Sequence, residues 1–130
     1  MSGRERLELG ALDPTRDFNF VTDTAAGLLA LGLCKAAEGQ VVNIGSGEEW
    51  SIAQTVELLC EIAGRRPDIA LKQERVRPVK SEVNRLLADN TKICELTGWK
   101  SKVPFREGLK QTVKWIEKNL QHFAPDRYAL

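Results

Sequence analysis

The spacing of hydrophobic and polar positions changes several times along the first 45 residues. Residues 18–21 (FNFV) have the pattern of a strand. Residues 24–37 are apolar on nearly every side, which predicts a helix enclosed on all faces. Gly39 ends this predicted helix. Residues 40–44 (QVVNI) contain two adjacent valines, a pattern typical of a strand buried on both faces of a parallel sheet.

A second helix is marked by its capping residues. Ser51 and Gln54 form a capping box, in which each side chain bonds the other residue's free backbone N–H. Apolar side chains follow at helical spacing up to Gly64, which predicts the end of the helix. Residues 68–74 alternate like a strand with one solvated face, and residues 82–89 predict another short extended piece.

The last third of the chain predicts two more helices. Asp89 can cap a short helix that runs to Leu96 and ends at Gly98. A longer amphipathic helix is predicted by apolar side chains spaced 4, 3, 4 and 3 residues apart, namely Leu109, Val113, Ile116, Leu120 and Phe123. Residues 124–130 have no such pattern and are expected to form a loose tail. Because no repeat or linker is visible, residues 1–130 are predicted to form a single α/β domain.

Composition excludes several classes of partner. The 130 residues are 42% hydrophobic and 28% charged, which is ordinary for a globular domain. The net charge is +1, so no global field attracts nucleic acid or anionic lipid, and any anion site must be local. The chain shows no signal-peptide core or membrane-length apolar stretch, which favours the cytoplasm. Cys34, Cys60 and Cys94 match neither zinc nor disulfide spacing and are predicted to be reduced and mostly buried.

Motifs for cofactor binding and catalysis are incomplete. Gly45 and Gly47 match the first two glycines of G-x-G-x-x-G, but Trp50 stands at the third position, so a tight turn between strand and helix explains the motif better. The only tyrosine, Tyr128, is too near the end for Tyr-x-x-x-Lys, and no nucleophile elbow is present. The single histidine, His122, falls on an amphipathic helix. We therefore assign no catalytic, cofactor-binding or metal-binding residue.

Two arginines are candidates for binding an anion. Arg16 precedes a predicted strand, and Arg77 precedes Pro78, whose ring holds the arginine extended. A guanidinium can bind a phosphate in bidentate fashion, and two can clamp a diphosphate. Spacing alone favours the simpler alternative of local ion pairs, Arg16 with Asp17 and Arg77 with Glu82, each worth at most about 1 kcal/mol.

Four stretches in order carry a resemblance to a known family. They are RDFNFVTDTAAG, VVNIGSGEEWSI, RPVKSEVNRLLADNTKICELTGW and VPFREGLKQTVKWI. Together they resemble the C-terminal part of the extended short-chain dehydrogenases that act on nucleotide sugars, and they cover nearly the whole chain. The stretches LDPTRDFNFVTDT and RPVKSEVNRLLAD are most similar to the NAD-dependent 4,6-dehydratases of the UDP-N-acetylglucosamine type.

The resemblance implies a fold and a site. In that family a large Rossmann domain binds NAD and carries the catalytic pair, while a smaller C-terminal part closes over the nucleotide sugar. It therefore implies a small substrate-binding subdomain with short strands, about four helices and no complete Rossmann domain. It also places Arg16 and Arg77 near the nucleotide diphosphate, against the ion-pair alternative, and Glu82 near a ribose hydroxyl. The expected ligand is a UDP-sugar, with NAD bound in full-length relatives but not by this chain.

Three functions follow from these observations. The first is a nucleotide-sugar-binding portion of an epimerase or dehydratase that is inactive alone. The second is a stand-alone, non-catalytic homodimer whose apolar faces cover each other, because large exposed apolar patches are rare on monomers. The third is a subunit that completes an enzyme together with a separate Rossmann-domain protein.

Overall fold

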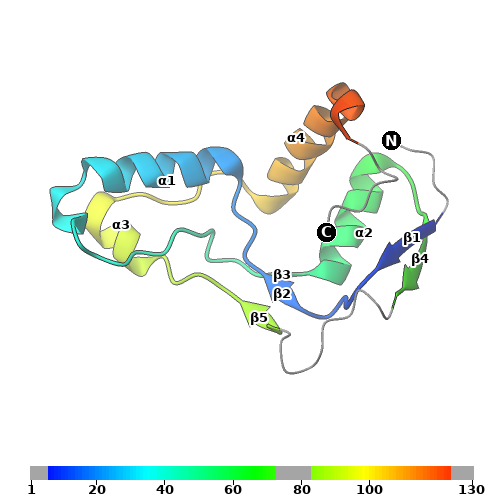
Figure 1. Cartoon of the computed structure of the whole chain (residues 1–130), viewed down its shortest axis with the longest axis horizontal. Coiled ribbons are helices and arrows are strands. Elements are labelled where there is room, and N and C mark those ends of the chain that lie inside the picture. Colours follow the sequence, from blue (N-terminus) through cyan, green and yellow to red (C-terminus); the bar gives the residue numbers. More distant parts are fainter. Residues whose placement is uncertain (1–5, 73–82, 124–130) are drawn as a thin grey trace.

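A computed structural model describes residues 6–72 and 83–123, which form four α-helices, short strands and two 3-10 turns (Figure 1). In chain order the elements are β1 (Arg6–Leu9), β2 (Thr15–Arg16), α1 (Val21–Leu33), η1 (Lys35–Ala37), β3 (Trp50–Ser51), α2 (Ile52–Ala63), β4 (Asp68–Leu71), β5 (Arg85–Leu86), α3 (Thr91–Thr97), α4 (Phe105–Lys118) and η3 (Leu120–His122).

The strands form two small sheets. In the first sheet, β1 pairs with β4 in parallel. In the second, β2 is the central strand, antiparallel to β3 and parallel to β5, so that Arg16 lies between Trp50 and Leu86. This second sheet connects the part of the molecule that holds α1 and α3 to the part that holds α2 and α4 (Figure 1).

The helices pack as two pairs, α1 with α3 and α2 with α4. In the first pair Ile93 is completely buried, and Trp99 is 8% exposed. Gly27 permits a close approach here, because a Cβ on it would lie 3.1 Å from Ile44 and 3.2 Å from Trp99. In the second pair Leu58 of α2 and Val113 of α4 are buried, so each pair has a small core of its own.

Asp23 fastens the first turn of α1 to the segment that leads into α4. Its Oδ2 accepts hydrogen bonds from the Ser101 hydroxyl (2.9 Å) and from the backbone N–H groups of Lys102 and Val103 (2.8 Å each). Burial acts to raise the pKa of Asp23, but the bonds from Val103, Lys102 and Ser101 outweigh it, so the pKa lies below its ordinary value. No motif or spacing in the sequence marks Asp23, because its partners lie about 80 residues away.

The strand predicted at residues 18–21 is wrong. Within the described residues the strand lies earlier, at Thr15–Arg16, and Val21 is already the first residue of α1. The helix begins there because the carbonyl of Phe20 accepts the N–H groups of Asp23 and Thr24, both at 3.0 Å. The helix predicted at 24–37 is also divided, since α1 ends at Leu33 and η1 follows.

The strand predicted at residues 40–44 is also absent from the described chain. This segment forms neither helix nor strand, and Val41 is 88% exposed. The enclosed environment predicted for the first helix is wrong as well, because Leu29 and Leu33 of α1 are 69% and 88% exposed. Adjacent valines and an all-apolar helix are typical of segments that are covered on two sides. The described residues cover residues 40–44 and α1 on one side only.

The second helix is confirmed. Ser51 Oγ accepts the Gln54 N–H at 3.0 Å, Gln54 Oε1 accepts the Ser51 N–H at 2.9 Å, and α2 ends at Gly64, whose φ is +63°. The strand predicted at 68–74 is confirmed over 68–71, and β5 lies within the extended piece predicted at 82–89.

The last two helices are also confirmed. The Asp89 carboxylate accepts the Thr91 N–H at 3.0 Å at the start of α3, and Gly98 ends that helix with φ +71°. The longer helix is confirmed over α4, which carries Leu109, Val113 and Ile116, but it ends at Lys118, so Leu120 lies in η3 and Phe123 follows η3. The predicted loose tail, 124–130, lies outside the described residues. No described helix has the length and apolar character to cross a bilayer.

The cysteines correct one expectation. Cys34, Cys60 and Cys94 are free thiols, as predicted, but each is partly exposed rather than mostly buried. They are therefore not the core residues that the sequence pattern indicated.

Replacing Asp23 with Ala is expected to destabilise the chain by about 3 kcal/mol, because two partly buried N–H groups and a hydroxyl lose their charged acceptor. Since folding lowers the pKa from about 3.8, the carboxylate's stabilisation is present above that pH and is lost as the pH falls through the folded value. Urea unfolding at pH 7 and at pH 3 measures both effects. The exposed Glu57→Ala serves as the control, and an equal loss in the two variants would contradict the assignment.

Candidate functional site

Arg16 lies on the central strand of the three-stranded sheet. Cross-strand pairing sets Trp50 and Leu86 beside it on the same face of the sheet. Its Nη1 donates to the carbonyl of Thr15 at 2.8 Å, and the side chain is partly buried. The guanidinium is therefore held near its own backbone at a fixed place on one sheet face.

Asp17 binds the glycine turn instead of Arg16. Its carboxylate accepts the Ser46 N–H (2.8 Å), the Ser46 hydroxyl (2.6 Å), the Gly47 N–H (3.0 Å) and the Ala88 N–H (3.3 Å). Among the described residues no ion pair joins Arg16 to Asp17, so the structure does not support the local pairing that spacing alone favoured.

The glycine turn is packed closely against these residues. A Cβ on Gly45 would collide with the Ala88 side chain and would lie 2.6 Å from the Asp17 carboxylate. Gly47 has φ +78°, in the left-handed region that favours glycine. The Gly45 carbonyl accepts the Asn90 side-chain amide at 3.2 Å. The motif is thus a tight turn fixed between β2 and α3.

An aromatic stack continues the face that carries Arg16. Phe105 stacks on Phe18 with ring centroids 5.2 Å apart, and Trp50 lies 4.9 Å from Phe105 on a tilted plane. This stack joins the start of α4 to the sheet. It fixes the strand from which Arg16 projects.

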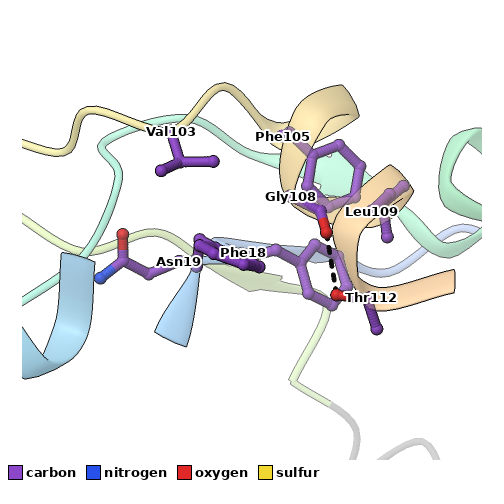
Figure 2. Close-up of a pocket in the computed structure, with 8 residues that line it drawn as sticks. Phe18, Asn19, Val103, Phe105, Gly108, Leu109 and Thr112 are labelled. Atoms are coloured by element: carbon purple, nitrogen blue, oxygen red, sulfur yellow. Dashed lines mark hydrogen bonds between the residues drawn. The ribbon is translucent and has the colours of Figure 1, made fainter. Parts of the chain in front are cut away.

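A cavity of about 150 Å³ lies beside this stack (Figure 2). Phe18, Phe105 and Val103 line it together with Asn19, whose Oδ1 is buried without a hydrogen-bond partner. The cavity is mainly apolar, and Thr112 at its edge donates its hydroxyl to the Gly108 carbonyl at 2.9 Å. The cavity has room for a small apolar group, and none of the side chains that line it is charged.

A separate polar cluster lies on the opposite face of the sheet. Arg85 Nε donates to both Glu49 oxygens at 2.8 and 3.0 Å, and the Thr15 hydroxyl donates to Glu49 at 2.9 Å. The hydrogen bond from Arg85 is the main reason that the pKa of Glu49 is lowered. Sequence analysis missed this cluster, because Thr15, Glu49 and Arg85 meet only through strand register.

The other two predicted site residues, Arg77 and Glu82, lie outside the described residues. Their approach to Arg16 stays a prediction. Within residues 6–72 and 83–123, no group of three or more His, Cys, Asp or Glu side chains is arranged to hold a metal ion.

Comparison with known proteins identifies the family. The family model described as GDP-mannose 4,6 dehydratase matches residues 1–112. The chain belongs to this family of NAD-dependent nucleotide-sugar epimerases and dehydratases. The resemblance inferred from the four sequence stretches is therefore confirmed.

Individual relatives agree with this assignment. The chain is 30% identical to UDP-glucuronic acid decarboxylase 1 of Xenopus tropicalis over 98% of its length. It matches the structure of dTDP-glucose 4,6-dehydratase from Bacillus anthracis in complex with NAD, with 29% identity, 95% coverage and a TM-score of 0.81. It also matches UDP-glucose 4-epimerase with UDP-glucose from Thermotoga maritima, with 32% identity, 90% coverage and a TM-score of 0.73.

The chain spans about a third of these family members. It covers 29% of the decarboxylase, 38% of the dehydratase chain and 36% of the epimerase chain. The small α/β fold with four helices, which the resemblance implied, is confirmed. The narrower similarity to the UDP-N-acetylglucosamine type stays a prediction.

Replacing Gly45 with Ala is expected to destabilise the chain by about 2 kcal/mol, because the new methyl group displaces the turn from Asp17 and Ala88. Gly32→Ala is the matched control, since a Cβ there meets nothing within 4 Å and α1 gains helix propensity. Thermal unfolding compares the two variants. A Gly45→Ala protein as stable as Gly32→Ala would show that the turn is not tightly fixed.

Proposed function

We propose that this chain is the nucleotide-sugar-binding portion of an NAD-dependent epimerase or dehydratase and is inactive alone. Arg16, with Arg77, binds the nucleotide diphosphate, and Glu82 bonds a ribose hydroxyl. The ligand is a UDP-sugar. The cytoplasmic location and the homodimer expected from sequence remain predictions.

The position of Arg16 is the observation that carries this proposal. The carboxylate next to it in sequence, Asp17, is bonded to the glycine turn and not to Arg16. Strand pairing and the aromatic stack fix the backbone on both sides of Arg16. A guanidinium oriented in this way suits bidentate binding of a phosphate group. The epimerase relative named above is described with UDP-glucose bound.

The glycine turn does not fit a nicotinamide cofactor. In a dinucleotide-binding loop the backbone N–H groups bond a pyrophosphate. Here the N–H groups of Ser46 and Gly47 bond the Asp17 carboxylate, whose negative charge would also repel a phosphate. The sequence contains no Tyr-x-x-x-Lys pair. We therefore derive no hydride-transfer step for this chain.

Replacing Arg16 with Ala should weaken binding of UDP by about 10- to 100-fold, the loss expected for a charge-assisted hydrogen bond to phosphate. Isothermal titration calorimetry of the purified chain with UDP measures the affinity. Arg85→Ala is the matched control, because it removes the same charge from the opposite face of the same sheet. Unchanged UDP affinity in Arg16→Ala, or an equal loss in Arg85→Ala, would contradict the proposal.

A further inference from the structure

The cavity beside the aromatic stack has no part in the proposed UDP site. Its walls come from residues 18–20, from Val103 and from the first two turns of α4 (Figure 2). Its volume is about 150 Å³, and it is partly open to solvent, so a ligand can enter while the chain stays folded. None of the side chains that line it is charged, and a phosphate therefore finds no partner there.

The side-chain amide of Asn19 has a fixed orientation at the wall of this cavity. Its Nδ2 donates to Thr24 Oγ1 at 2.9 Å, and the Thr24 hydroxyl donates to the Phe20 carbonyl at 3.4 Å. Because a hydroxyl has a single proton, Thr24 can only accept from Asn19, and the amide nitrogen must face α1. Figure 2 shows the amide oxygen of Asn19 turned away from its nitrogen, to the side on which Val103 lies.

The amide oxygen of Asn19 is an acceptor that lacks a donor. Oδ1 is buried and has no hydrogen-bond partner among the described residues. A buried carbonyl oxygen without a donor carries a free-energy cost, which a donor on a ligand removes. Thr112, the other polar side chain of the cavity, already donates its proton to the Gly108 carbonyl at 2.9 Å and offers only lone pairs. The group that completes this cavity must therefore be a donor.

The remaining walls determine the rest of the ligand. Phe18, Phe105, Leu109 and Val103 present apolar surface to the cavity. An ordered water needs two to four polar partners, whereas apolar cavities of about this volume stay dry and accept a single benzene-sized ring. Apolar walls with one buried acceptor therefore suit an apolar ring that carries one donor.

We propose that this cavity binds a small apolar molecule with one hydrogen-bond donor, namely a six-membered ring that carries a hydroxyl group. The ring lies against Phe18 and Phe105, and its hydroxyl donates to Asn19 Oδ1. The site is separate from the proposed UDP site, because Arg16 does not line it.

The test is an NMR titration of the isotope-labelled chain, residues 1–130, with phenol. Phenol should bind saturably with a Kd of about 1 mM, and its ring protons should give NOEs to the methyl groups of Val103 and Leu109. Asn19→Leu should weaken phenol binding by about tenfold or more, because the buried hydroxyl loses its acceptor. The same variant should change the affinity for toluene, which has no donor, by less than about twofold.

Thr112→Val is the matched control, since it removes the other polar group at the edge of the cavity and leaves Asn19 in place. It should leave phenol affinity within about twofold of that of the natural chain. No saturable phenol binding, binding of toluene alone, or an equal loss of phenol affinity in the two variants would overturn the proposal. If Asn19→Leu does not fold, the NOEs of the natural chain decide, because phenol contacts elsewhere on the chain also contradict it.

Discussion

The carboxylate of Asp17 is the constraint on which the site depends. It bonds Ser46, Gly47 and Ala88 at once, so one side chain ties β2 to the glycine turn and to the segment after β5. These three pieces are far apart in the sequence, and the strands that join them have two residues each. Without this negative charge, the N–H groups of the turn would lose their acceptor, and the short strands would depend on the Glu49 cluster and the aromatic stack for their alignment.

The same interaction explains why a familiar motif has a different role here. In dinucleotide-binding loops, glycines between a strand and a helix leave backbone N–H groups free for a phosphate. In this chain the Asp17 carboxylate accepts those N–H groups, and the residue that we propose for phosphate binding is the neighbouring Arg16. Arg16 and Asp17 are adjacent in sequence but act on opposite faces of the sheet, as consecutive strand residues do.

Local signals in the sequence predicted local structure well. The capping box of Ser51 and Gln54 and the left-handed glycines Gly64 and Gly98 gave correct helix ends, because each depends on a few neighbouring residues. The pattern at 40–44 failed for a different reason. Adjacent valines are typical of a strand that is buried on both faces, but the described residues cover only one face of this segment. Contacts formed through register, such as Glu49 with Arg85, leave no periodic signal.

The two helix pairs are joined in more than one place. The strands β2, β3 and β5 form one link (Figure 1), and the hydrogen bonds from Lys102 and Val103 to the Asp23 carboxylate form a second. Two helix pairs that are joined at two separate places cannot turn about one link without breaking contacts at the other. The direction of the Arg16 side chain therefore depends on Asp23 as well as on the sheet.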